Sequence, residues 1–174
     1  MDSLVIRRAT PADAAQLCEF ARRTFNETFA DANTPADMAQ HNLRTYSAEI
    51  QRAEIASPSI VTLIAEENGR AIAYAQLRSE SVPASISTRP TIELWRFYVD
   101  KPAMGRGVAQ RLMDRVLADA REGGAKSIWL GVWERNARAL AFYRKSGYVE
   151  VGRHVFRLGS DAQTDFILEH MLRV

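Results

Sequence analysis

The chain has 174 residues, with 23 basic and 21 acidic side chains and a formal net charge of +2. This length suits one domain over residues 1–174, whose folding removes roughly 70% of the unfolded surface from water. So small a net charge gives no argument for a nucleic-acid partner or an anionic membrane. The N-terminus lacks a signal-peptide apolar stretch, and no apolar run approaches the roughly 20 residues of a spanning helix. We therefore expect a cytoplasmic protein.

Residues that often mark catalytic or metal sites are sparse in this chain. Cys18 is the only cysteine, and its apolar helical surroundings favour a buried side chain over a nucleophile. The histidines at 41, 154 and 170 are far apart and lack metal-ligand spacing. We therefore expect no metal site.

The first half of the chain predicts a strand, helices and a β-hairpin. Residues 4–9 indicate the strand, and Thr10-Pro11 and Thr34-Pro35 each indicate a helix start. We expect these helices to end near residues 30 and 56, and the second is either continuous or interrupted. The hairpin follows from Asn68-Gly69, which is the strongest short hairpin signal, between strands 60–66 and 70–78. Serines and prolines in residues 80–90 indicate a loop.

The second half predicts alternating strands and helices. The expected elements are strand 91–100, helix 108–122, strand 127–132, a helix from Asn136 to just before Gly147, and strands 148–156 and 163–172. A hairpin followed by a β-α-β crossover implies an α/β (α+β) protein, with a mixed sheet and helices on both faces.

The loop between strand 91–100 and helix 108–122 contains Gly105-Arg106-Gly107. The first N–H groups of a helix have no partner within it, and glycine lets a ligand approach the backbone, so this loop suits an anion such as a pyrophosphate. Arg106 and Arg111 would add positive charge. A tight turn with a solvated basic face is the alternative. A Rossmann site is disfavoured because Gln110 replaces its last glycine, and a P-loop lacks its Gly-Lys-Ser/Thr.

Two motifs resemble a known family. Residues 104–109, Met-Gly-Arg-Gly-Val-Ala, resemble the Gln/Arg-x-x-Gly-x-Gly/Ala motif of the GNAT acetyltransferases, with Met104 replacing the usual Gln or Arg. Residues 136–148 resemble the family's later Asn-x-x-Ala-x-x-Phe-Tyr-x-x-x-Gly-Tyr/Phe pattern. The resemblance implies a GNAT fold, with a central, mixed, mostly antiparallel twisted sheet of about six or seven strands.

The resemblance also implies acetyl-CoA as cosubstrate, held between strands 91–100 and 127–132 where these splay apart. Its pantetheine would pair with the first strand and its pyrophosphate with the loop amides. The implied residues are Phe97, Tyr98, Val99, Gly105, Arg106, Gly107, Val108, Ala109, Gln110 and Asn136. Lys145 either reaches a phosphate or faces solvent.

Amide formation requires a neutral amine and a protonated leaving thiolate. Tyr143 lies on one helical face with Asn136 and Leu140 and matches the family's general acid; a core tyrosine is the alternative. Glu93 is the expected base, directly or through water. A strict strand alternation would place it on one face with Trp95, Phe97 and Val99, although many strand glutamates only face solvent.

Three segments are similar to the PaiA-type spermidine/spermine N-acetyltransferases: residues 25–38, 130–136 and 156–167. This similarity implies a small primary amine, such as a polyamine, as acceptor. Glu27, Asp31, Asp37 and Glu93 are candidates for an acidic pocket, or simply solvated carboxylates. Two other functions stay open: a CoA-responsive regulatory protein with little catalysis, and a peptide N-terminal acetyltransferase. A homodimer through the C-terminal strands also stays open.

Overall fold

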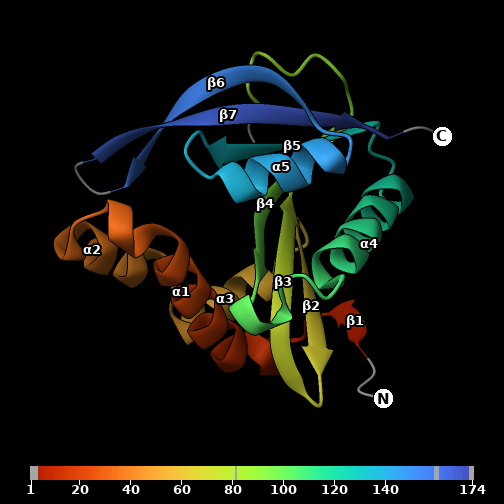
Figure 1. Cartoon of the computed structure of the whole chain (residues 1–174). Coiled ribbons are helices and arrows are strands. Elements are labelled where there is room, and N and C mark those ends of the chain that lie inside the picture. Colours follow the sequence, from red (N-terminus) through yellow and green to blue (C-terminus); the bar gives the residue numbers. More distant parts are fainter. Residues whose placement is uncertain (1–3, 81, 159–160, 173–174) are drawn as a thin grey trace.

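A computed structural model describes residues 4–80, 82–158 and 161–172. Seven strands form one sheet in the order β1-β2-β3-β4-β5-β7-β6 (Figure 1). They are β1 (Val5–Arg8), β2 (Ile60–Glu67), β3 (Arg70–Arg78), β4 (Thr91–Val99), β5 (Ser127–Trp133), β6 (Val149–Leu158) and β7 (Asp161–Met171). Each neighbouring pair is antiparallel except β4 with β5. The predicted α/β fold with a mixed, mostly antiparallel sheet is confirmed.

Helices cover both faces of this sheet. They are α1 (Ala14–Phe29), α2 (Pro35–Thr45), α3 (Ala48–Ala56), α4 (Val108–Glu122) and α5 (Ala137–Lys145), with 3₁₀ turns at Pro11–Asp13, Ala30–Ala32 and Lys101–Ala103. The interruption between α2 and α3 follows from Ser47, whose hydroxyl caps α3 by accepting from the Ile50 amide. No helix in the described ranges is long and apolar enough to cross a membrane.

A large apolar core lies on each face of the sheet. One packs α4 and α5 on the sheet, with Leu112, Met113 and Leu140 among its buried members. The other packs α1 and its neighbours on the opposite side through Leu17, Phe20 and others. We call these two sides of the sheet the α4 face and the α1 face.

The parallel contact between β4 and β5 is short. Thr91–Glu93 pair with Ser127–Trp129, and beyond that level the two strands are no longer paired. Strand β4 continues to Val99 beside β3, while β5 continues to Trp133 beside β7. The sheet is therefore split between its fourth and fifth strands, as the family resemblance implied.

A β-bulge in β4 lies at the start of this split. Gln76 of β3 pairs with Arg96 and Leu77 with Leu94, so Trp95 is the extra residue. As a result Leu94 and Phe97, three positions apart, both join the core on the α4 face. The expected common face for Glu93, Trp95, Phe97 and Val99 is therefore wrong, because the bulge shifts the alternation by one residue.

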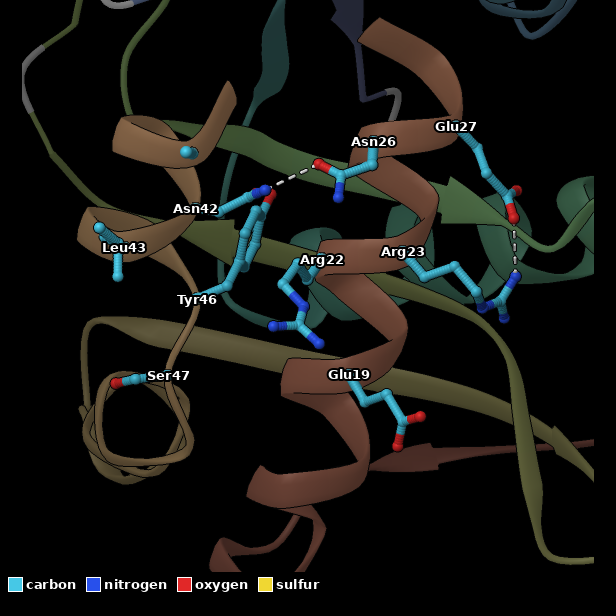
Figure 2. A pocket seen from close by; sticks show the side chains of 10 residues that line it. Glu19, Arg22, Arg23, Asn26, Glu27, Asn42, Leu43, Tyr46 and Ser47 are labelled. Carbon is cyan, nitrogen blue, oxygen red and sulfur yellow. Dashed lines mark hydrogen bonds and ion pairs between the residues drawn. The ribbon is translucent and has the colours of Figure 1, made fainter. Parts of the chain in front are cut away.

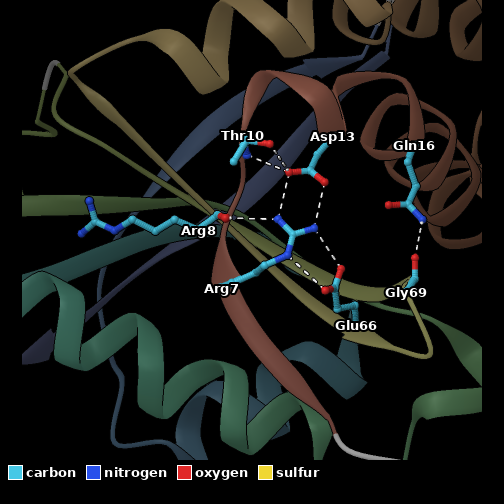
Figure 3. Close-up of polar contacts among 7 residues, drawn as sticks. All are labelled: Arg7, Arg8, Thr10, Asp13, Gln16, Glu66 and Gly69. Atoms are coloured by element: carbon cyan, nitrogen blue, oxygen red, sulfur yellow. Dashed lines mark hydrogen bonds and ion pairs between the residues drawn. The ribbon is translucent and has the colours of Figure 1, made fainter.

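A partly buried ion-pair network connects strand β1 to β2 and to the turn that precedes α1 (Figure 3). The guanidinium of Arg7 donates to both carboxylate oxygens of Asp13, at 2.8 and 2.9 Å, and to both of Glu66, at 3.0 and 3.1 Å. Asp13 also accepts from the Thr10 backbone amide at 2.7 Å. These hydrogen bonds, chiefly the one from Arg7, hold the pKa of Asp13 well below its usual value.

Replacing Asp13 by Asn should lower the free energy of unfolding at pH 7 by about 1–2 kcal/mol, because charge-assisted hydrogen bonds are lost at a partly screened site. A lowered carboxyl pKa contributes stability above the unfolded pKa of about 3.9 and loses it as the pH falls. The difference should therefore shrink towards pH 3 in denaturant titrations.

The matched control is Asp114→Asn. Asp114 is exposed and accepts a hydrogen bond from Gln110, with no ion pair among the described residues. It should change stability by less than about 0.5 kcal/mol. Equal destabilisation by the two substitutions would contradict the assigned role of the network.

Candidate functional site

The free edge of β4 lines the split. The Asp100 amide donates to the Ile72 carbonyl beside β3 at 2.8 Å. Because successive residues of a strand alternate, the N–H and C=O groups of Phe97 and Val99 point the other way, towards the position that β5 has left. Tyr98 faces β3 instead, and its ring stacks on Tyr74 at 5.7 Å between centroids. Phe97 and Val99 thus offer a strand-like edge, and the Tyr98 backbone does not.

A group of backbone amides lies beyond the end of this edge, before and within the first turn of α4. Among the described residues, the N–H groups of Gly105, Gly107, Val108, Ala109 and Gln110 have no hydrogen-bond acceptor, whereas Arg106 donates to Ala103 at 3.4 Å. The N-terminal end of α4, a helix of 15 residues, also carries partial positive charge from the helix dipole. The loop therefore suits a phosphate group.

Both glycines of the loop are required by the backbone. Gly105 has φ of 76° and Gly107 has φ of 79°, a conformation that L side chains rarely adopt. A Cβ at either position would meet nothing within 4 Å. The space beside the loop is open on that side, where a ligand approaches.

The arginines near the loop are already engaged. Arg106 pairs with Glu67 at 2.7 Å, and Arg111 donates to the Leu4 carbonyl at 3.2 Å. Both side chains are therefore engaged by the protein itself, and their contribution to an anion site stays a prediction. Arg138 is a cation that the sequence reasoning missed: its Nη1 lies 2.5 Å from the Met104 sulfur, so α5 brings it to the loop.

Helix α5 carries the other predicted ligand residues. The Oδ1 atom of Asn136 accepts from the Ala139 amide at 3.1 Å, so this residue caps the helix. Lys145 is exposed at the opposite end of α5. Their predicted roles in cofactor binding stay predictions.

Tyr143 lies on the buried face of α5, with Leu140 as expected. Its ring meets Phe97 of β4 edge-on, with centroids 6.3 Å apart, so the helix places it against the free strand edge. Burial raises the pKa of Tyr143 above its usual value, and the hydroxyl therefore keeps its proton at neutral pH. No hydrogen bond to this hydroxyl is present within the described ranges.

Glu93 is buried at the closed end of the split. Its carboxylate accepts from Nε of Arg78 at 2.5 Å. The Trp95 ring lies between two guanidinium groups, those of Arg78 at 4.0 Å and Arg96 at 3.7 Å. The predicted base is therefore engaged in an ion pair in a cationic neighbourhood.

The three segments that resemble the PaiA-type enzymes come together on the α1 face. Phe29 at the end of α1 meets Trp133 at the end of β5, with ring centroids 5.8 Å apart. Asn33 accepts a hydrogen bond at 2.8 Å from Gln163 of β7. Gly159, which belongs to the third segment, lies outside the described residues. These contacts gather the segments at the open end of the split.

An open groove of about 770 Å³ lies between α1 and α2 (Figure 2). It is lined by Glu19, Arg22, Arg23, Asn26, Glu27, Ala39, Asn42, Leu43, Tyr46 and Ser47. Glu27 is the one member of the predicted acidic set that lines it, and Arg23 pairs with Glu27 at 3.2 Å. The groove has as many arginines as glutamates, so it is not the expected acidic pocket.

The remaining sequence candidates have ordinary surroundings. Cys18 is half-buried against the α1 core, and burial raises the pKa of its thiol. Within the described ranges, no group of three or more His, Cys, Asp or Glu side chains is arranged to hold a metal ion.

The fold and the split identify a class of acyltransferase, and the sequence comparisons agree. The model of the Acetyltransferase (GNAT) family matches residues 15–148. The chain is 31% identical over 172 residues to an uncharacterised N-acetyltransferase encoded in the pepI 3′ region of Lactobacillus delbrueckii subsp. lactis, covering 99% of each chain. The protein therefore belongs to the GNAT family, as an acetyl-CoA-dependent N-acetyltransferase.

Two further comparisons concern better-described proteins. The crystal structure of the PaiA N-acetyltransferase from Thermoplasma acidophilum in complex with coenzyme A has the same fold, with a TM-score of 0.78 and 22% identity over 97% of this chain and 99% of that one. The N-alpha-acetyltransferase RimI of Mycobacterium tuberculosis is 34% identical over 116 residues, which cover 64% of this chain and 68% of that protein.

Gly107→Ala should weaken CoA binding at least about tenfold. A left-handed alanine costs roughly 1–2 kcal/mol, and relief of that strain would move the neighbouring amides out of line. Isothermal titration with CoA measures the effect.

Gly69→Ala is the matched control, because Gly69 has φ of 74° and equally open surroundings in the β2–β3 hairpin. It should lose similar stability and keep its CoA affinity. Equal CoA affinities for both variants would exclude the loop as the phosphate site.

Proposed function

We propose that this enzyme transfers the acetyl group of acetyl-CoA to a primary amine of a small molecule, the acceptor being a polyamine such as spermidine or spermine. The observation that carries the proposal is the free edge of β4 at Phe97 and Val99, which leads to unpartnered amides at one end and borders Tyr143. The edge suits the amide groups of pantetheine, which would add as a further strand, and the loop suits the pyrophosphate.

Tyr143 acts as the general acid in this proposal. Attack of the amine on the thioester carbon forms the C–N bond and breaks the C–S bond. The departing thiolate takes the phenolic proton, which the Tyr143 hydroxyl has retained because it is buried. The cosubstrate supplies the acetyl group, and the protein supplies its position and this proton.

The base of the proposal is Glu93, directly or through water. Its carboxylate must exchange the Arg78 contact for a contact with the amine or the water, since Arg78 occupies one of its oxygens.

Polyamine specificity rests on the segments that resemble the PaiA-type enzymes. Two contacts join all three segments: the Phe29 ring lies against Trp133, and Asn33 accepts a hydrogen bond from Gln163. Peptide N-terminal acetylation is the second candidate, favoured by the similarity to RimI. A CoA-responsive regulator, a homodimer and a cytoplasmic location stay predictions.

Strand β6 is an edge strand that exposes Val149 and Val155, and this surface suits a second copy of the chain.

Tyr143→Phe should lower kcat about 10²-fold or more while leaving the CoA dissociation constant within a factor of two, because only the proton donor is removed. Steady-state thiol release and CoA titration measure these two quantities.

Tyr148→Phe is the matched control. Tyr148 is buried beside Tyr143, and its hydroxyl contacts the Met113 sulfur at 3.7 Å. It should retain kcat within about threefold. A protein that acts only as a CoA sensor would show no change in transfer for either variant.

An acceptor panel tests the amine. Spermidine and spermine should be acetylated with a higher kcat/KM than amino acids, aminoglycosides or peptides with free N-termini. Turnover of peptides without turnover of the polyamines would replace the polyamine proposal with the peptide one. CoA release with each acceptor and mass spectrometry of the product provide the measurement.

A further inference from the structure

Asp165 and His154 form a pair that the functions described above do not use. Asp165 of β7 lies opposite Trp133 of β5 on one side and His154 of β6 on the other. Its Oδ2 atom lies 3.6 Å from Nε2 of His154. The residue is only 9% exposed, and its buried Oδ1 atom has no hydrogen-bond donor in the described part of the chain. A buried carboxylate oxygen without a donor is costly, which points to a donor from a ligand.

The pair lies at the open end of the split. Trp133, opposite Asp165, is four residues beyond Trp129, the last β5 residue paired with β4, or about 13 Å along the strand. The Trp133 ring contacts Phe29 of α1. This position is on the α1 face, where the segments that resemble the PaiA-type enzymes meet.

Tyr98 connects this pair to the proposed acid. Burial is the main cause of the raised pKa of Tyr98, and Tyr46, Arg96, Tyr143 and Asp165 all act electrostatically on its hydroxyl. Tyr143 approaches from the α4 face, in the core under α5. Tyr98 is half-buried, and both Asp165 of β7 and Tyr143 of α5 are near enough to act on it electrostatically.

Gly131 makes room for the pair. A Cβ at this position of β5 would lie 3.1 Å from Cε1 of His154 and 3.4 Å from Oδ2 of Asp165. Contacts of 3.1 Å are tighter than most Cβ contacts, so any larger residue would displace the imidazole. The glycine therefore lets both side chains lie directly against the β5 backbone.

Two other buried carboxylates fit an amine less well. Glu169 also has an oxygen without a donor, but it pairs with Trp129, where β4 and β5 are still together. Glu93 is held by Arg78 beside a second guanidinium. A substrate ammonium would be repelled by those two arginines.

We propose that Asp165, positioned by His154, is the site that binds the acceptor ammonium and takes its proton. This inference rests on the proposed acetyl transfer, and within it Asp165 takes the role of base in place of Glu93. The ligand is a primary ammonium group on a small molecule, whose N–H donates to Oδ1 of Asp165.

The proton balance follows from the two side chains. The ammonium gives one proton to the Asp165 carboxylate, which passes it through Oδ2 to Nε2 of His154. The His154 side chain is 37% exposed, so the imidazolium releases the proton to solvent. The neutral amine then forms the C–N bond as the C–S bond breaks. Once the C–N bond has formed, nitrogen gives its second proton to the restored Asp165 carboxylate, which passes it to solvent by the same route. The Tyr143 phenolate, which has given its proton to the thiolate, regains one from solvent.

The charges facing Asp165 bear on its basicity. Burial is the largest cause of its raised pKa, followed by the opposing effect of His154 and a raising effect of Glu134. The hydroxyl of Tyr98 in β4 lies within electrostatic range as well. A raised carboxyl pKa favours proton uptake from the substrate.

Asp165→Asn tests the proposal, with Glu93→Gln beside it and Glu150→Gln as the control. Glu150 is an exposed carboxylate of β6 that pairs with Arg153. Three quantities are measured for each variant and the parent: CoA affinity, spermidine affinity of the CoA-loaded protein by calorimetry, and kcat/KM for spermidine from pH 6.5 to 9.5. His154→Gln is added for the pH profile.

Asp165→Asn should keep its CoA affinity, bind spermidine at least about tenfold more weakly, and lose about 10²-fold or more in kcat/KM at pH 7. The loss should shrink as the pH rises and more of the amine is neutral. His154→Gln should shift the pH profile in the same direction by a smaller amount, and Glu150→Gln should match the parent.

The inference is overturned if Asp165→Asn binds spermidine as tightly as the parent, if the parent does not bind it at all, or if the loss is the same at every pH. It is also overturned if Glu93→Gln alone removes the pH dependence. Failure of the parent to acetylate any amine while spermidine binding still depends on Asp165 would instead remove the proposed function.

Discussion

The separation of β4 from β5 is the constraint on which the rest of this structure depends. A strand leaves its neighbour only if the backbone groups on the vacated edge meet another partner, because unpaired amides are costly when buried. The bulge at Trp95 changes the alternation of β4 at the level where the strands part. It sends Phe97 towards α5 and leaves the edge at Phe97 and Val99 free. A ligand with amide groups would resolve the constraint, and this is the basis on which we propose that acyl-CoA binds here.

The two sides of the split differ in whether main-chain groups or side chains line them. The proposed cofactor side consists largely of main chain: the edge of β4 and the amides that open α4. A site made of main chain tolerates side-chain changes, so Met104, in place of the polar residue of the family motif, would leave these amides in position. The proposed acceptor side consists of side chains from α1, β5, β6 and β7, including Phe29, Trp133 and Asp165. On this proposal, substrate choice depends on contacts between distant segments.

Burial sets the proton chemistry on both sides. It raises the pKa of Tyr143 and of Asp165 alike, which keeps the phenol protonated and makes the carboxylate more basic. The acid and the proposed base thus acquire their properties from the same cause. Glu93, by contrast, is held in an ion pair with Arg78.

The sequence alone determined the order of the elements, the glycine loop and the helix that carries Tyr143. These features depend on local rules: apolar periodicity, N-caps, and positive φ at Gly105 and Gly107. It could not place Glu93 correctly, because one extra residue at Trp95 reverses the face of each residue before it, and nothing local marks that bulge. Nor could it show that Arg106 is paired with Glu67, or that His154 meets Asp165. Those neighbours are set by strand register and by packing across the sheet, which only the tertiary structure decides.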